Sequence, residues 1–432
     1  MNLLLSLLLL VSMLLPDGYP KPRKGTFALT HARIVTVTNG VVENGTLLIK
    51  DGKIAAIGVD IPLPEDAEII DCSGLTIYPG FIDSGTRLGL EEIGSLPETQ
   101  DDDELGELTP HVRALTAINP NSVLIPVTRI SGVTTVLSMP SNGLFPGTAA
   151  LINLVGYTPD QMYTGFEGVL LNFPPTGRRG RFDRRSEEAI KKAAERALKQ
   201  LNDVWEKAVL YARIDSAYQA QPEEGRMPEF IPPMESLIRV VRGELPLIIE
   251  VNTAQDIVKA ISWVKERHIQ RVIFTGVAEG WRVADKLAEA GIPCIVGPVL
   301  SLPTRAYDRY DRPYANAGLL HKAGVKIALR TMETENVRNL PFHAGFAVAY
   351  GLPPEEALRA VTINPAEIFG VDDHLGSLEV GKSATLFVVD GDPFETKTQV
   401  KHVFIDGYLI PMVSRQTRLY EEFLHRNPGL VK

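Results

Sequence analysis

The stretch LPLIIEVNTAQDIVKAISWVKERHIQRVIFTG, residues 245–276, contains two short apolar runs separated by a longer amphipathic segment. The runs 245–251 and 271–276 have the length and the Leu, Ile, Val and Phe content of buried strands. From Asp256 to Arg267, apolar residues recur at the period of an α-helix. A strand, a helix and a second strand in this order predict two parallel strands joined by a covering helix.

The same alternation continues on both sides of this stretch. Further strands are predicted at 133–139, 168–173, 293–298 and 326–331, and a further helix at 279–289. Repeated alternation of this kind predicts either an eight-fold barrel or an open parallel sheet.

Both ends of the chain have a different pattern, in which short strands are separated by turns. This pattern covers Gly25 to Tyr78 and returns at Gly376. Strand-rich segments on both sides of a βα region predict that the two ends pair into one β-domain, with the βα region inserted between them.

Composition and charge limit the function classes. The length of 432 residues predicts a barrel-sized domain with a satellite, or two comparable domains. The composition, 44% hydrophobic and 22% charged, is typical of a soluble globular protein. A net charge of −9 argues against nucleic acid as a partner, because phosphate binding requires clustered Lys and Arg in excess. We therefore expect a small-molecule ligand. Cys72 and Cys294 are the only cysteines and lie in apolar runs, which favours buried free thiols over a disulfide framework.

Residues 1–20 are predicted to be an export signal or an apolar N-terminal segment. Leu3 to Leu15 is almost purely apolar and ends at Pro16, so it is too short to span a bilayer but suits a secretory signal. No Lys or Arg precedes it and no clear cleavage site follows, so a mis-set start or an N-terminal anchor is the alternative. We expect export to the periplasm or the extracellular space, with a cytoplasmic or membrane-attached protein as the alternative. Residues 413–432 are predicted to be a charged surface tail.

Five motifs follow one another along nearly the whole chain after the first 25 residues. They are VENGTLLIKDGKIAAIG at 42–58, YPGFIDSGTRLGL at 78–90, HVRALTAINP at 111–120, LPFHAGFAVAYGLPPEEALRAVTINPAEIFGV at 340–371, and GSLEVGKSATLFVVDGDPFE at 376–395. As an ordered set they resemble the amidohydrolase superfamily, in particular its imidazolonepropionase-like and secreted members.

This resemblance implies a fold and a chemistry. The implied fold is a (β/α)8 TIM-like barrel of residues 79–375, inserted into a composite β-sandwich of residues 26–78 and 376–412. The implied activity is hydrolysis of non-peptide or dipeptide-like C–N bonds. Zinc or another divalent metal at the mouth of the barrel would lower the pKa of a bound water and polarise the scissile carbonyl.

The metal positions implied by the resemblance hold unsuitable residues. The family pattern Asp-x-His-x-His after the first barrel strand falls on residues 83–87, so its two histidines correspond to Gly85 and Arg87. Glycine offers no ligand, and a guanidinium is permanently cationic and has no acceptor atom. Later ligand positions fall on Glu250, Asn252, Thr275 and Met332, with Glu333 one residue further on. We therefore predict no metal and no other cofactor.

Two of these positions allow alternative interpretations. Arg87 could bind the carboxylate or phosphate of a ligand, or it could replace the lost metal charge by pairing with Glu91, Glu92 or Glu250. For Asp83, a structural carboxylate that accepts hydrogen bonds from loop backbone is favoured over a catalytic group.

Three further features are interpreted as structural. The acidic run 98–107 is predicted to be a solvated loop, with a cation-attracting rim of the pocket as the alternative. His343 is predicted to be a packing histidine. A set of arginines is predicted to be exposed, with anion recognition as the alternative: Arg178, Arg179, Arg181, Arg184 and Arg185.

Two hypotheses about function follow. The first is a metal-free, degenerate homologue that binds a small ligand at the barrel mouth, lined by Arg87, Asn252, Thr275 and Met332. Its candidate protein partners are a second copy of the chain or an active amidohydrolase relative. The second is an active hydrolase with a rearranged site or atypical metal binding, in which Asp83, Arg87, Glu250 or Glu333 serves as acid, base or ligand.

Overall fold

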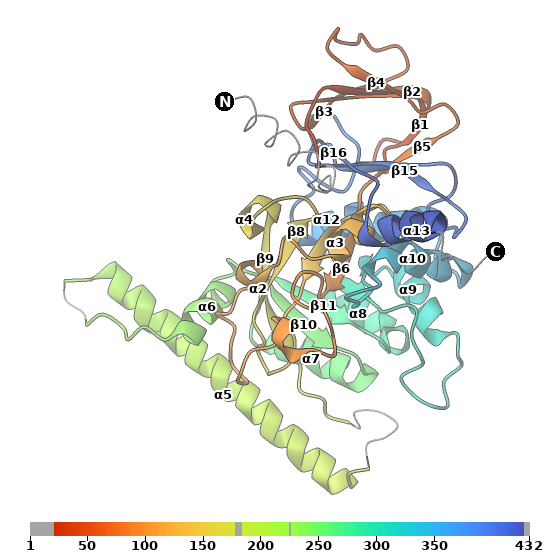
Figure 1. Cartoon of the computed structure of the whole chain (residues 1–432). Coiled ribbons are helices and arrows are strands. Elements are labelled where there is room, and N and C mark those ends of the chain that lie inside the picture. Colours follow the sequence, from red (N-terminus) through yellow and green to blue (C-terminus); the bar gives the residue numbers. More distant parts are fainter. Residues whose placement is uncertain (1–20, 178–183, 224–225, 427–432) are drawn as a thin grey trace.

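The computed structural model describes residues 21–177, 184–223 and 226–426 of the chain. Within these residues the protein has a strand-rich lobe and a larger barrel, and a long helix extends away from the barrel (Figure 1). The predicted export signal in residues 1–20 lies outside the described residues, as do Arg178, Arg179 and Arg181.

The strand-rich lobe combines both ends of the chain in one eight-stranded sheet. The strand order is β16-β15-β14-β5-β1-β2-β3, and β4 also pairs with β1. The two halves meet where β14 runs antiparallel to β5, with Phe387 opposite Tyr78. The strands of this sheet are β1 (Phe27–Val35), β2 (Val41–Lys50), β3 (Lys53–Gly58), β4 (Glu68–Asp71), β5 (Thr76–Pro79), β14 (Leu386–Val389), β15 (Val400–Ile405) and β16 (Tyr408–Ile410).

A second eight-stranded sheet forms the barrel, in the order β6 to β13. Neighbouring strands are parallel, except that β8 runs antiparallel to both β7 and β9. The Met332 N–H donates to the Gly85 carbonyl at 2.9 Å and so joins the last strand to the first. The strands are β6 (Phe81–Thr86), β7 (Val133–Ser138), β8 (Thr148–Asn153), β9 (Tyr163–Asn172), β10 (Leu247–Val251), β11 (Val272–Gly276), β12 (Cys294–Val296) and β13 (Ile327–Leu329).

The predicted fold, a TIM-like barrel with a separate β-domain, is thus confirmed, with one local difference. Strand β8 begins at Thr148, within the turn-rich segment 140–150, and the short α4 separates it from β9. The chain therefore makes a hairpin at this point, where a regular (β/α)8 barrel would have a crossover helix.

Helices cover the barrel and extend from it. The longest, α5, has 34 residues and projects beyond the body of the molecule (Figure 1). None of the described helices is long and apolar enough to cross a membrane. The helices are α2 (Ala114–Ala117), α3 (Leu124–Arg129), α4 (Pro159–Met162), α5 (Glu187–Ala220), α6 (Pro232–Val241), α7 (Ala254–Glu266), α8 (Ala284–Ala290), α9 (Arg312–Lys322), α10 (Leu340–Ala349), α11 (Pro354–Ala360), α12 (Ile363–Phe369) and α13 (Arg415–His425), with short 3-10 turns η1 (Pro97–Thr99), η2 (Gly280–Arg282) and η3 (Val337–Asn339).

The interior of the barrel explains how the site is assembled. Every strand contributes at least one buried apolar residue to a single cluster, which includes Ile82, Leu137, Leu151, Leu170, Ile248, Ile273, Ile295 and Ala328. Side chains two residues apart on a strand point to the same face. The residues two positions further along β10, β11, β12 and β13 therefore also face inward, at the carboxyl ends of these parallel strands. They are Glu250, Thr275, Gly297 and Arg330.

Candidate functional site at the barrel mouth

Arg330 lies at the centre of the barrel mouth. It directly follows β13, and only 3% of its surface is exposed. Its guanidinium contacts Glu250 through two hydrogen bonds, from NH1 to Oε2 at 2.6 Å and from NH2 to Oε1 at 2.9 Å. NH1 also donates to the Thr275 hydroxyl at 2.8 Å, and Nε donates to the Gly297 carbonyl at 3.1 Å. Groups at the carboxyl ends of the three neighbouring strands β10, β11 and β12 thus bind one buried cation.

Arg330 also takes up the space beside the first strand. A Cβ atom placed on Gly85 would lie 2.9 Å from Cδ of Arg330 and 2.9 Å from Sδ of Met139. Carbon atoms in contact are separated by about 3.5–4.0 Å, so no histidine fits at residue 85 unless Arg330 moves. The packing of Arg330 therefore requires the glycine that stands in the place of the family histidine.

These residues do not fit a divalent metal. The guanidinium binds the side chains of Glu250 and Thr275, two of the positions where the resemblance implies metal ligands, and it abuts a third, Gly85. A fixed cation at this point repels a dication and uses the carboxylate that would hold it. Within the described parts of the chain, no group of three or more His, Cys, Asp and Glu residues is placed to hold a metal ion.

Asp83 is fully buried beneath this centre. Its Oδ1 accepts from the backbone N–H groups of Gly85 and Thr331, each at 3.1 Å, and its Oδ2 accepts from the Thr331 hydroxyl at 2.5 Å. Burial raises the pKa of Asp83 to about 7, although these hydrogen bonds and the charge of Arg330 act in the opposite direction. Because no solvent reaches it, Asp83 is placed to join β6 to the segment after β13 rather than to contact a substrate.

Arg87 is placed away from the contacts of Arg330, contrary to the expectation that it would take the position of the metal. Its Nε lies 3.2 Å from Oδ2 of Asp102, and its NH1 lies 3.7 Å from Oε2 of Glu91. The Arg87 side chain is 38% exposed. Arg87 therefore neutralises acids of the loop after β6, and Arg330 supplies the central cation. Of the partners expected for Arg87, the structure pairs it with Glu91.

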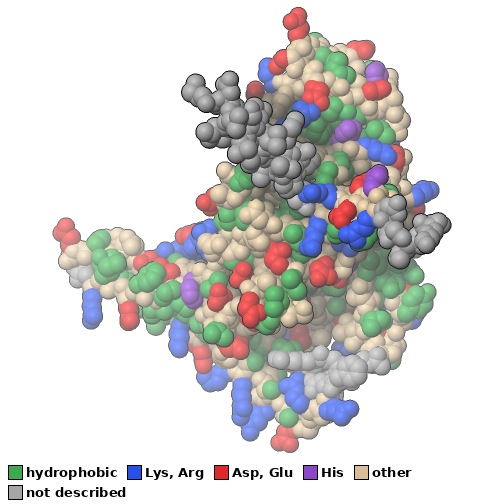
Figure 2. Space-filling view, in the orientation of Figure 1, with side chains coloured by type: hydrophobic (Ala, Val, Ile, Leu, Met, Phe, Trp, Pro, Cys, Tyr) green, Lys and Arg blue, Asp and Glu red, His purple; other side chains and the backbone are tan. Residues whose placement is uncertain are grey.

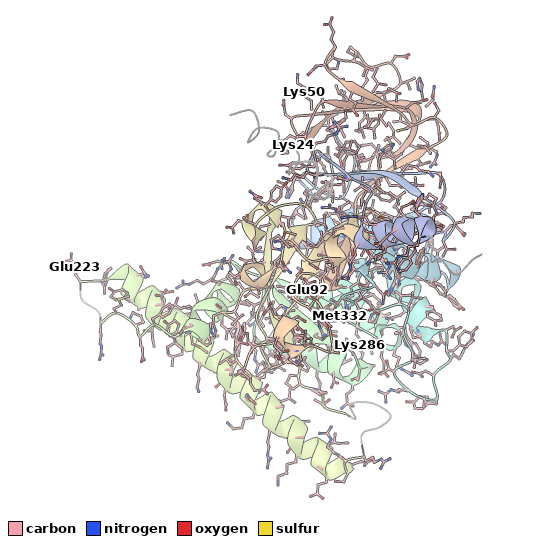
Figure 3. All side chains as sticks on the ribbon, in the orientation of Figure 1. Lys24, Lys50, Glu92, Glu223, Lys286 and Met332 are labelled. Carbon is pink, nitrogen blue, oxygen red and sulfur yellow. The ribbon has the colours of Figure 1, made fainter. Side chains whose placement is uncertain are left out.

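Asn252, Met332 and Glu333 differ in how close they come to this centre. Nδ2 of Asn252 donates to Oε1 of Glu250 at 2.8 Å, so this amide belongs to the same network. Met332, which is labelled in Figure 3, adopts a positive φ of 53°, and its backbone N–H closes the barrel by donating to the Gly85 carbonyl. The Glu333 side chain is exposed and makes no hydrogen bond or ion pair with any residue that the structure describes. Glu333 is thus not brought together with Glu250.

A cleft of about 820 Å³ opens beside Glu250 at the mouth. Asn142, Asn172, Phe173, Asn252 and Tyr307 are among the residues that line it. One wall is held by an ion pair between the buried Glu279 and the partly exposed Arg305, a bidentate contact that includes NH2 to Oε2 at 3.0 Å. The hydrogen bond to Glu279 raises the pKa of Arg305. The cleft therefore combines amide side chains with a partly aromatic wall.

Arg330, Arg305 and Glu279 were not predicted as site residues from the sequence. A signal for Arg330 was present in IALRTM, where an arginine follows inward-facing Ala328 by two residues and so faces the barrel interior. No comparable signal marks Glu279 and Arg305, because they come from two loops that only the folded chain brings together.

The remaining predicted features have the following environments. Asp102, within the acidic run, is buried and accepts from Ser141 Oγ at 2.6 Å, while most of its neighbours are exposed. His343 is buried on α10, its Nδ1 accepts from the Val299 N–H at 3.2 Å, and burial lowers its pKa to about 4. Arg184 and Arg185 are exposed.

Comparisons with known proteins agree with this architecture. A family model described as the amidohydrolase family matches residues 265–410. Imidazolonepropionase from Geobacillus sp. (strain WCH70) is 25% identical over 404 residues, which cover 81% of this chain and 84% of that protein. Amidohydrolase tasK from Hapsidospora irregularis is 23% identical over 388 residues, which cover 84% of this chain but only 39% of that protein.

Among solved structures, an amidohydrolase from Thermotoga maritima MSB8 has a similar fold. The TM-score is 0.77 at 27% identity, over 90% of this chain and all (100%) of that one. The family match, the relatives that cover most of the chain and the common fold together show that this protein belongs to the amidohydrolase superfamily.

Proposed function

We propose that this hydrolase-related protein is a metal-independent member of its superfamily, and that it binds a small polar molecule in the cleft at the barrel mouth. The observation that carries the proposal is the bidentate pair between Arg330 and Glu250. In this arrangement a side-chain cation stands among the positions that would otherwise ligate a metal. The Arg330 guanidinium then neutralises the Glu250 carboxylate without a metal ion, and no metal-bound hydroxide is formed.

The chemistry of the cleft supports a polar ligand. An amide side chain has two N–H donors and two acceptor lone pairs. Asn172 donates to the Gly143 carbonyl at 2.8 Å, and Asn252 donates to Glu250 at 2.8 Å. Each amide therefore keeps hydrogen-bonding capacity for a ligand while its orientation is fixed. Fixed polar groups on a partly aromatic wall are typical of small-molecule sites.

A hydrolysis assay tests the metal-independent part of the proposal. The purified protein is incubated with N-acyl amino acids and dipeptides, first with added zinc or manganese and then after chelation. We expect no turnover that depends on the metal. Hydrolysis that chelation abolishes and zinc restores would refute the proposal.

Binding of the same compounds tests the ligand part. We expect that at least one of them raises the melting temperature of the wild-type protein, and that the shift is reduced in Asn172→Ala and in Asn252→Ala. Asn39→Ala changes an exposed amide in the strand-rich lobe and serves as the matched control. Equal shifts in all four proteins would place binding outside this cleft.

A second candidate function is hydrolysis by a rearranged site. It is favoured by one observation, namely that the Glu250 side chain is 23% exposed and lines the cleft. A carboxylate in this position could act on a bound substrate as a base. If metal-free turnover is found, Glu250→Gln should abolish it, and Glu333→Gln provides the comparison. Turnover that survives both substitutions together would remove this candidate.

A further inference from the structure

A second cavity lies where the strand-rich lobe meets the other end of the barrel. It has a volume of about 620 Å³ and lies between α3, the segment 155–157, β16 and α13. Strand β7 begins just after α3, so this cavity is at the end of the barrel opposite to the mouth. Much of its wall is apolar and comes from Ile125, Pro126, Val155, Tyr408 and Val413. Its volume is in the range of small-molecule sites, which is about 300–1,000 Å³.

Arg129, the last residue of α3, lines this cavity and carries an uncompensated charge. Its NH1 donates to the Leu154 carbonyl at 3.3 Å. Its Nε is buried and has no hydrogen-bond partner. No carboxylate pairs with Arg129 in the described parts of the chain, and burial lowers its pKa to about 10. A partly buried guanidinium whose Nε has no partner and which lacks a counter-ion is unfavourable, and a bound anion would offset this cost.

The rim of the cavity adds more positive charge. Lys21 and Arg415 also line it, and neither forms an ion pair with another described residue. Asp406 is the one acid among the lining residues that the structure describes. It already lies 3.7 Å from Nζ of Lys24 and accepts from Ser383 Oγ at 3.0 Å. In a chain of net charge −9, three cations against one paired acid make a local excess of positive charge.

Figure 2 shows Lys and Arg side chains near the junction of the lobe and the barrel, and Figure 3 marks Lys24 there. We propose that this cavity binds a small organic carboxylate with an apolar body, whose carboxylate contacts Arg129 while its apolar part packs between α3 and α13. A planar guanidinium matches a carboxylate, and the apolar part of the wall suits an apolar body. The site is separate from the mouth cleft, so it stands or falls independently of the proposed function.

Binding of octanoate to the full chain tests this site, with octan-1-ol as a neutral probe of the same length. Isothermal titration at low salt should give an affinity for octanoate at least about tenfold higher than for octan-1-ol, because the hydrogen bond to Arg129 is charge-assisted. Arg129→Met replaces the aliphatic stem of Arg129 by an unbranched apolar side chain and removes the guanidinium charge. It should lower the octanoate affinity by about tenfold and leave octan-1-ol binding unchanged.

Arg309→Met, which removes an exposed arginine elsewhere on the surface, is the matched control and should bind octanoate like the wild-type protein. An octanoate affinity that is the same in wild type and Arg129→Met would overturn the proposal, as would the absence of binding to the wild type.

A measurement on the wild-type protein alone covers the case in which Arg129→Met does not fold. Octanoate that carries a diazirine group is cross-linked by light, and the labelled peptides are identified by mass spectrometry. Labels on α3, on 155–157 or on α13 support the site. Labels confined to the mouth, in 172–175 or 304–307, or the absence of labels that free octanoate displaces, exclude it.

Discussion

At the scale of single residues, the pair between Arg330 and Glu250 is expected to dominate the energetics of the mouth. Arg330→Met leaves the Glu250 carboxylate without its partner, and breaking a buried ion pair from one side costs about 3 kcal/mol or more. Denaturant unfolding should show this loss. Lys199→Met, which removes a solvent-exposed pair with Asp203, should cost less than about 1 kcal/mol.

The double variant Arg330→Met with Glu250→Gln provides the internal check on this prediction. It removes both charges, so its loss of unfolding free energy should be smaller than the sum of the two single losses. Strict additivity would mean that the two side chains do not interact, against the contacts at 2.6 and 2.9 Å.

Asp83 makes a second residue-scale prediction, which concerns pH. Its pKa is raised from 3.8 to about 7 in the folded state, chiefly by burial. The folded protein therefore holds this proton more tightly than the unfolded chain does. The contribution of Asp83 to stability is fully present below about pH 4 and is lost as the pH rises through about 7.

Asp83→Asn removes this titration while an amide still occupies the same place. Unfolding free energies between pH 4 and pH 7 should fall less steeply in the variant, by up to about 1.4 kcal/mol per pH unit. Parallel curves for the wild type and the variant over this range would show that Asp83 ionises at its ordinary pKa in the folded protein.

At the scale of elements, α5 is held to the barrel by aromatic packing. Trp205 is 4% exposed, and its ring lies 5.4 Å from that of Trp263 on α7 in an edge-to-face arrangement. Trp205→Ala should therefore reduce the unfolding free energy by about 3–5 kcal/mol. Leu210 lies on the same helix and is 57% exposed, so Leu210→Ala should change stability by no more than about 0.5 kcal/mol. Similar losses in the two variants would argue against docking through Trp205.

Strand β8 illustrates why one element was not predicted. The segment 140–150 contains Asn142, Gly143, Pro146 and Gly147, which are residue types typical of turns, and no strand was predicted between 139 and 168. The strand begins at its end, at Thr148, and its direction is fixed by pairing with β7 and β9. The turn-forming residues themselves stay outside the strand, and the short segment after them joins the sheet through pairing, which a single sequence does not display.

At the scale of the whole molecule, the barrel and the strand-rich lobe were predictable because hydrophobic periodicity reports directly on burial. The βαβ pattern of 245–276 appears as β10, α7 and β11 at nearly the predicted residues. The site was predictable only in part. Gly85, Glu250, Asn252 and Thr275 were expected at the mouth, where Glu250, Asn252 and Thr275 share one network and Gly85 packs against Arg330.

The identity of the central cation was not predicted, for a physical reason. Arg87 and Arg330 both follow a barrel strand, and only Arg87 was considered from the sequence. The choice depends on packing, because the space beside Gly85 receives the side chain of Arg330 while Arg87 pairs with Asp102 in the following loop. Which of the two arginines packs beside Gly85 therefore depends on distances that exist only in the folded protein.

The central claim is that a guanidinium of the chain stands in the place of the superfamily metal. Elemental analysis of the wild-type protein tests this most directly, after incubation with zinc, manganese or nickel and removal of the unbound ion. Our account predicts no stoichiometric metal. Retention of stoichiometric zinc, manganese or nickel by the wild type, lost on Glu250→Gln, would contradict it.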